Sequence, residues 1–260
     1  MKKVSVFIAI IVMVMKLHAD NRATIKLSDY DWLVVKRQQL IEKTSDYPSF
    51  VNGLEKIENK DLIGNNNVII TTINIDDPEF NLAAFYLYGT DNLFSVFING
   101  EEIQNELDDG NFYAAITPFT ESGSFVLSLQ PMHEISGDDF YQFIANAQIA
   151  LLKGIALNRL SIKKDMFFGG KLLEVGIQNF LDKDVDGKIY ARIYDGESQE
   201  LITENNNCAY SRSGIETLIE VNFPEMQDSI AGKICLAEVE MVDKENNESV
   251  VDVITLPVKF

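Results

Sequence analysis

Carboxylates are spaced for cation binding in one stretch of the sequence, where Asp182, Asp184 and Asp186 alternate with other residues and a glycine follows. This pattern begins an EF-hand calcium loop, in which oxygen ligands surround the cation. The twelfth position is Ile193 rather than glutamate, and the flanking segments resemble strands. The sequence therefore predicts either a looser calcium loop completed by Asp195 or a solvated acidic turn between two strands.

A second group of residues has the side chains that bind sugars. Aromatic rings stack on pyranose faces, and neighbouring amides and carboxylates bond to hydroxyl groups. Phe112 and Tyr113 are consecutive in a predicted strand, so they point to opposite faces and one of them is expected to be exposed. Trp32 lies in an apolar run and is interpreted as a core residue, with stacking as the alternative. The candidate sugar-binding residues are Trp32, Tyr47, Asp109, Asn111, Phe112 and Tyr113.

Other catalytic and metal chemistry lacks the residues that it needs. A serine hydrolase requires an oriented histidine, and His133 follows a Pro-Met pair in a predicted loop with no nucleophile-elbow pattern around any serine. Gly169-Gly170 is not followed by the Lys-Ser or Lys-Thr of a phosphate loop. Two cysteines cannot form a structural zinc site. We therefore expect no catalytic residue and no cofactor other than calcium.

The first nineteen residues have the pattern of a secretory signal peptide. Lys2 and Lys3 precede an apolar run over residues 4–15, and Ala19 supplies a small residue at the expected cut. The alternative is an uncleaved anchor, although the run is too short to span a bilayer. We expect export to the periplasm, the cell surface or the extracellular space, and the leader suggests a bacterium.

The composition is that of a folded, acidic protein. The 260 residues include 40 acidic and 22 basic side chains, for a net charge of −18, and 46% are hydrophobic. Loss of the three leader lysines would change the charge to −21. Such negative charge repels nucleic acid, and no apolar stretch is long enough to cross a membrane.

Cys208 and Cys235 are the two cysteines of the chain. An oxidising exterior would allow them to pair. The alternative is two buried free thiols, because Cys235 lies in an alternating, strand-like run.

Short β-type runs separated by Asn, Asp and Gly clusters fill the chain and favour an all-β fold with antiparallel sandwiches. Asn99-Gly100, between two such runs, predicts a tight hairpin turn. Strands are expected over residues 68–75, 80–88, 94–98, 101–103, 112–116, 124–129, 171–180, 188–194, 217–223, 233–242 and 250–260.

One segment has helical rather than strand spacing. Over residues 136–151 the apolar residues recur at helical intervals, with Ser136 as the N-cap and Asp138 and Asp139 in the first turn. The alternative is an extended connector. A domain boundary is expected near residues 150–160, which gives a leader over 1–19 and domains over 20–152 and 153–260.

The order of several motifs resembles the start of glycoside hydrolase family 2 enzymes. Residues 85–103 resemble the apolar strand ending in Asn-Gly of that family's sugar-binding, galactose-binding-like jelly roll, and Pro118-Phe119 resembles its later Pro-Phe segment. Residues 153–162 resemble the Gly-Ile crossing into its immunoglobulin-like sandwich, which residues 172–179 and 187–196 continue. Here the Gly-Ile is followed by Ala-Leu rather than the family's tryptophan and basic residue.

The resemblance implies an expectation about catalysis. In the family a TIM barrel with two catalytic glutamates follows the sandwiches, and this chain ends at Phe260, where that barrel would begin. Asn105-Glu106 and Asn247-Glu248 reproduce the family's acid/base Asn-Glu pair, but both fall in polar turns and are interpreted as solvated surface residues. We therefore expect a protein that is not an enzyme.

The sequence leaves two functional classes open. The first is an interaction or structural protein of a bacterial envelope or extracellular assembly, with other exported proteins or further copies of itself as partners. The alternative is a carbohydrate-binding module without hydrolase activity. The acidic charge and the missing sugar-pocket residues favour the first, and the family resemblance favours the second.

Overall fold

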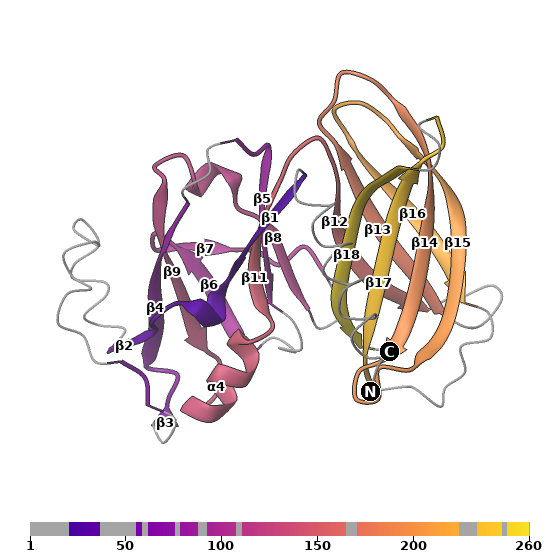
Figure 1. The fold of residues 1–260 in the computed structure, drawn as a ribbon. Coiled ribbons are helices and arrows are strands. Elements are labelled where there is room, and N and C mark those ends of the chain that lie inside the picture. The colour runs from indigo at the N-terminus through magenta and orange to yellow at the C-terminus, as the bar shows by residue number, and fades with distance from the viewer. Residues whose placement is uncertain are drawn as a thin grey trace, which may run out of the picture. The chain divides into compact units, whose positions relative to one another are not determined.

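The computed structural model describes residues 21–36, 56–58, 62–75, 79–87, 93–107, 111–164, 171–223, 233–245 and 249–259. The predicted leader, Tyr47, Asp109 and the Asn247-Glu248 pair lie outside these residues. The chain divides into two compact units (Figure 1). The described residues between 24 and 150 form the N-terminal unit, and those from 151 onward, together with residues 21–23, form the C-terminal unit. Strands dominate both units, so the predicted all-β fold class is confirmed.

Two main sheets build the described part of the N-terminal unit, with strand orders β1-β11-β5-β8 and β2-β4-β9-β6-β7. Their strands are β1 (Arg22–Lys26), β2 (Leu33–Lys36), β4 (Asn67–Asn74), β5 (Leu82–Leu87), β6 (Phe94–Ile98), β7 (Glu101–Ile103), β8 (Phe112–Ala115), β9 (Ser124–Pro131) and β11 (Ala147–Leu152). Smaller elements are η1 (Leu27–Asp29), β3 (Leu62–Ile63), η2 (Thr117–Phe119), β10 (Ile135–Ser136) and α4 (Gly137–Ile144).

The predicted Asn-Gly hairpin is confirmed. Ile98 pairs with Glu101 across a two-residue turn between β6 and β7. Asn99 and Gly100 have φ angles of 50° and 84°, the left-handed conformation that a type I′ turn requires at both central positions. The local sequence therefore determines this turn.

Helix α4 begins as the sequence predicts and ends earlier. The Ser136 hydroxyl accepts a hydrogen bond from the Asp139 N–H at 3.1 Å, which is the expected N-cap. Phe140 is fully buried, and its ring meets Trp32 edge-on with centroids 5.4 Å apart. The helix stops at Ile144 rather than continuing to residue 151, because residues 147–152 form the inner strand β11.

The C-terminal unit is a sandwich of a three-stranded sheet, β12-β13-β16, and a four-stranded sheet, β15-β14-β17-β18. All the described pairings in these sheets are antiparallel. The strands are β12 (Ile155–Lys164), β13 (Lys171–Asn179), β14 (Val185–Asp195), β15 (Leu201–Ser211), β16 (Glu216–Phe223), β17 (Ile234–Asp243) and β18 (Ser249–Lys259). Inward-facing aliphatic residues of both sheets, such as Val175 and Ile189, are fully buried.

Asparagine side chains close one side of this sandwich, where the outer strands β15 and β16 meet. The amide nitrogens of Asn205 and Asn207 donate to the carbonyls of Asn222 and Glu220 on β16, at 2.6 and 2.8 Å. The amide oxygen of each asparagine also accepts the N–H of the residue that follows it. These side chains therefore satisfy backbone groups at strand edges that would otherwise offer a template for strand addition.

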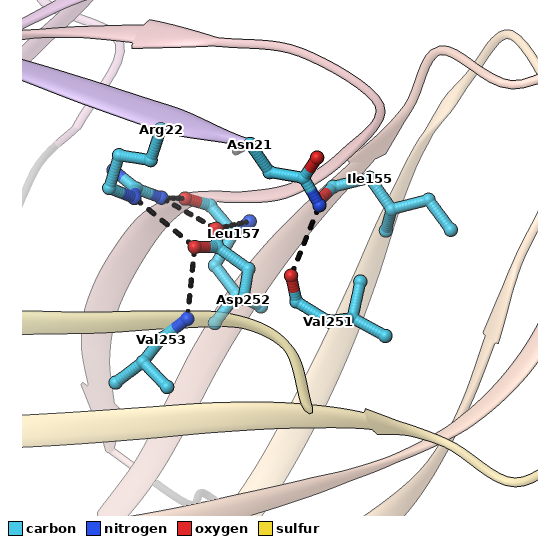
Figure 2. A network of polar contacts seen from close by, with 7 residues as sticks. All are labelled: Asn21, Arg22, Ile155, Leu157, Val251, Asp252 and Val253. Carbon is cyan, nitrogen blue, oxygen red and sulfur yellow. Dashed lines mark hydrogen bonds and ion pairs between the residues drawn. The ribbon is translucent and has the colours of Figure 1, made fainter. Parts of the chain in front are cut away.

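A buried ion pair closes the opposite side, between β12 and β18 (Figure 2). The Asp252 carboxylate, which is fully buried, accepts from the N–H groups of Leu157 and Val253 at 2.8 and 2.9 Å. Arg22 pairs with Asp252 at 2.9 Å and also donates to the carbonyl of Leu157. The C-terminal unit thus includes a residue from the start of the described chain.

A polar cross-strand link lies over Gly176 of β13. Glu216 of β16 accepts from the Asn158 amide at 2.6 Å and from the Arg159 guanidinium at 3.1 Å, both on β12. A Cβ at Gly176 would lie 2.5 Å from Asn158 Oδ1 and 2.7 Å from Arg159 Cγ. Only glycine leaves room for side chains to span from β12 to β16 at this point.

We predict that Gly176→Ala destabilises the C-terminal unit by about 1–3 kcal/mol, because the methyl group displaces the link to Glu216. Chemical denaturation followed by circular dichroism measures the loss. Gly64→Ala is the matched control, since a Cβ there would meet no atom within 4 Å. Equal stability of the two variants would contradict the prediction.

Candidate functional site

The aromatic residues predicted to stack on sugars are buried. Trp32, Phe112 and Tyr113 are 1%, 8% and 2% exposed. The interpretation of Trp32 as a core residue agrees with this burial, and its indole N–H donates to the carbonyl of Leu27 at 3.0 Å. The expectation that Phe112 or Tyr113 is exposed is wrong, because both faces of β8 are covered: Phe112 packs on Phe85 and Tyr113 on Tyr86.

The predicted polar partner Asn111 is also buried, at 4% exposure. Its carbonyl accepts the amide N–H of Asn105 at 2.7 Å. The other polar candidate, Asp109, and the aromatic candidate Tyr47 lie outside the described residues. The described candidates therefore offer no open aromatic face with polar groups beside it.

The Asn105-Glu106 pair has a structural role at the outer edge of β8. The Asn105 amide oxygen accepts the N–H groups of Leu107 and Tyr113, at 3.1 and 3.0 Å. The Glu106 carboxylate is exposed and accepts the N–H of Ala115 at 3.0 Å. The two side chains occupy the free hydrogen-bonding edge of β8, which explains this Asn-Glu pair without catalysis.

The acidic motif forms a hydrogen-bonded turn before β14. Asp184 accepts from the Tyr210 hydroxyl and, at 2.8 Å, from the Ser213 N–H. These two hydrogen bonds hold the pKa of the Asp184 carboxyl below its ordinary value of 3.8. Asp182 and Asp186 are exposed neighbours of this turn.

Asp195 does not complete a calcium loop with the other three carboxylates. β14 runs without interruption from Val185 to Asp195, which places Asp195 roughly 30 Å from Asp186 at the rise of an extended strand. Asp195 instead accepts the N–H groups of Glu197 and Ser198, each at 2.9 Å. Within the described ranges, no three His, Cys, Asp or Glu side chains are grouped closely enough to hold a metal ion.

We predict that Asp184→Asn weakens the dependence of stability on pH in acid. Folding lowers the pKa of Asp184, so the ionised carboxylate adds to the free energy of unfolding. This contribution is complete above the unfolded-state pKa of 3.8 and is lost as the pH falls through the folded-state pKa. Urea denaturation at a series of pH values between about 5 and 2 measures the slope. Asp182→Asn, which changes the charge in the same turn, is the control. The same slope in wild type and Asp184→Asn would refute the role of this turn.

The two cysteines do not pair. Cys208 and Cys235 are both free, the first exposed and the second buried. They flank β14 at positions opposite Lys188 and Asp195 respectively, which separates them by roughly 20 Å along the strands. A disulfide requires Cα atoms within about 7 Å, so the free thiols of the alternative interpretation are present, although only Cys235 is buried.

Residues that local spacing did not single out gather on the outer face of the β15-β14-β17-β18 sheet. Alternate residues of β14 point into the core, where Ile189, Ala191 and Ile193 are fully buried. The residues between them, Tyr190 and Arg192 among them, therefore lie on the opposite face. In Figure 1, β14 runs between β15 and β17, so this face extends over all four strands.

An apolar row crosses one end of this outer face. Leu201 on β15 pairs with Tyr194 on β14, which pairs with Leu236 on β17, which in turn pairs with Pro257 on β18. Leu201 is 49% exposed, and Ile234, beside Leu236 on the same face of β17, is 58% exposed. We call these five residues the apolar row.

A charged row lies directly beside the apolar row. Arg192 contacts Glu238 at 2.8 Å, Glu240 at 3.5 Å and Glu204 at 3.8 Å. The hydrogen bond to Glu238 raises the pKa of Arg192 above its ordinary value. Burial, and then the charge of Glu238, raise the pKa of Tyr194. One arginine thus lies among three glutamates, and this charged row has excess negative charge.

The arrangement fits recognition of another molecule better than bond cleavage. Tyrosine and arginine beside exposed aliphatic side chains are the residues enriched at the centres of protein interfaces. Tyr190, also on this face, has the Lys188 ammonium 4.5 Å from its ring centroid. The intramolecular cation therefore competes for a ring that a sugar would need for stacking.

Comparisons with known proteins identify a fold. No known family model matches this sequence, and no curated protein matches it. Among solved structures, Bacteroides uniformis β-glucuronidase 2 is similar with a TM-score of 0.55 and 10% identity over 92% of this chain and 32% of that one. A β-glucuronidase from glycoside hydrolase family 2 is similar with a TM-score of 0.51 and 15% identity over 93% of this chain and 31% of that one.

A further structure, Bacteroides uniformis β-glucuronidase, is similar with a TM-score of 0.52 and 11% identity over 92% of this chain and 32% of that chain. The chain spans about a third of the length of these enzymes. It has the fold of part of a family 2 glycoside hydrolase, as the order of its motifs predicts.

None of the helices in the described ranges combines the length and apolar character needed to span a membrane.

Proposed function

We propose that this chain is an exported, non-catalytic interaction protein that binds another protein through the outer face of the β15-β14-β17-β18 sheet. The supporting observation is the apolar row beside the charged row. An exposed aliphatic and aromatic strip next to an arginine is what a partner protein needs for a buried centre with a polar rim. The leader pattern in the sequence supports export.

The charge of the site favours a basic partner. Arg192 is surrounded by Glu204, Glu238 and Glu240, and the whole chain carries a net charge of −18. Two copies meeting through this face would bring like charges together, which opposes association. A partner with an apolar strip and basic side chains would bury the apolar row and neutralise the glutamates.

The proposal of a non-catalytic protein is supported by the structural roles of the Asn-Glu pair that resembles a catalytic motif and of two carboxylates from the predicted calcium loop. Asn105 and Glu106 bond to the backbone at the edge of β8. Asp184 and Asp195 bond to the backbone of turns at opposite ends of β14. Each of these polar groups has a structural function of the kind that capping side chains perform.

The proposal predicts that photo-crosslinking residues on the outer face capture a partner. A crosslinker at position 201 or 234, introduced in the host that exports the protein, should give one discrete adduct whose partner has a basic surface. Position 62 is the matched control, because Leu62 is 69% exposed and lies in the N-terminal unit. The same adducts from all three positions would contradict the proposal.

The affinity for the captured partner provides a quantitative test. Tyr194→Ala should weaken binding by about tenfold or more, as truncation of an aromatic interface residue does. Glu238→Lys should weaken it further at low salt, because the partner is expected to be basic. Glu101→Lys, an exposed change on β7, is the charge-matched control.

A carbohydrate-binding module is the second candidate, favoured by the fold shared with β-glucuronidases. A glycan array with the chain from residue 20 onward separates the two. If the chain binds a specific glycan, keeps that binding in Tyr194→Ala and has no protein partner at the outer face, the carbohydrate-binding module becomes the first candidate function. Calcium binding by the acidic turn stays a separate prediction, tested by calorimetric titration.

A further inference from the structure

The seam between β12 and β18 is closed by side chains rather than by a β-ladder. β12 is the outer strand of its sheet, and its pairing with β13 shifts register between Leu157 and Arg159. At this irregularity the N–H of Leu157 donates to Asp252 and its carbonyl accepts from Arg22. Both backbone groups of Leu157 therefore depend on this ion pair.

The ion pair is buried, which makes its two members interdependent. The side chain of Asp252 is 0% exposed and that of Arg22 is 12% exposed. A carboxylate removed from water requires an opposite charge and hydrogen-bond donors, and loss of one partner leaves a charge that burial penalises. Without Arg22, the buried charge of Asp252 would thus destabilise the packing of β12 against β18.

Asn21 extends the same contact. Its carbonyl accepts the N–H of Lys153 at 2.9 Å. Its amide donates to the carbonyl of Val251 at 3.1 Å and towards that of Ile155 at 3.5 Å (Figure 2). Gly154 has a φ of +66°, and a Cβ there would lie 3.0 Å from Asn21 Oδ1. The backbone of the C-terminal unit is therefore shaped to receive Asn21.

We propose that Asn21 and Arg22 act as a strap that locks the β12–β18 seam and that releases as a local event, without unfolding the sandwich. Arg22 lies 135 residues from Leu157 and 230 residues from Asp252 in the sequence. Arg22 begins β1, which pairs with β11, but only a few polar contacts join Asn21 and the Arg22 side chain to the β12–β18 seam. A few polar contacts open at lower free energy than a β-ladder does. Release leaves Leu157 without its partners and exposes edges of β12 and β18 that can accept another strand.

Hydrogen exchange of the full chain tests the strap. In Arg22→Ala the amides of Leu157, Val253 and Lys153 should exchange about 100-fold faster, the scale expected when a buried ion pair is broken. Amides of the β14–β17 ladder should keep their wild-type rates. Arg22→Lys, which keeps the charge but cannot fork between a carboxylate and a carbonyl, should give an intermediate effect.

Control variants separate the strap from general destabilisation. Arg212→Ala removes an exposed arginine elsewhere in the C-terminal unit and should change no seam amide. Arg22→Met combined with Asp252→Leu removes both buried charges, so stability should recover while the Leu157 amide still exchanges fast. Unchanged seam amides in Arg22→Ala, or an equal rise in β14–β17, would overturn the proposal.

Self-association gives the second readout. Sedimentation velocity should show concentration-dependent association of Arg22→Ala, because its strand edges are open, and none of Arg212→Ala. If Arg22→Ala stays monomeric although its seam amides exchange fast, the strap does not prevent strand addition at β12 and β18. This result would overturn the proposal that release exposes edges able to accept another strand.

Discussion

The structure depends on one constraint, which is that backbone hydrogen-bonding groups at the edges of a sheet need partners. In this protein side chains supply several of them. Asn205 and Asn207 bridge β15 to β16, Asp252 and Arg22 close β12 against β18, and Asn105 and Glu106 occupy the edge of β8. The Asn105-Glu106 pair, which resembles a catalytic motif, is thus one of several polar groups that complete the edges of the sheets.

This use of polar side chains changes how the functional surface is found. The aromatic rings that sequence spacing favoured, those of Phe112 and Tyr113, belong to the core because β8 is covered on both faces. The exposed face that resembles an interface is assembled by strand register instead. Tyr194 and Leu201 lie together because β14 and β15 pair antiparallel, and Arg192 meets Glu238 through the pairing of β14 with β17. The solved structures with the same fold support the sandwich architecture and leave the partner to experiment.

The contrast between the two seams of the C-terminal unit also bears on how the unit holds together. Asn205 and Asn207 bridge a seam between strands that are near in sequence. Arg22 and Asp252 join the start of the described chain to its last strand. Neutral amides tolerate solvent, whereas a fully buried carboxylate requires its cation. The first seam is therefore a local closure, and the second makes the closure of β12 against β18 dependent on a distant segment.

Features that depend on short-range interactions could be predicted from the sequence alone. Alternating apolar residues predicted most strands, Asn99-Gly100 predicted the hairpin, and Ser136 predicted the start of α4. Tertiary structure decided the rest, because those outcomes depend on neighbours distant in sequence. Residues 201–211, rich in asparagine, form the strand β15 only because β14 and β16 lie on either side of it. Residues 147–152 leave the helical pattern to become an inner strand. The outer face has no signature in the sequence, since pairing of four strands, and not spacing along one, brings its residues together.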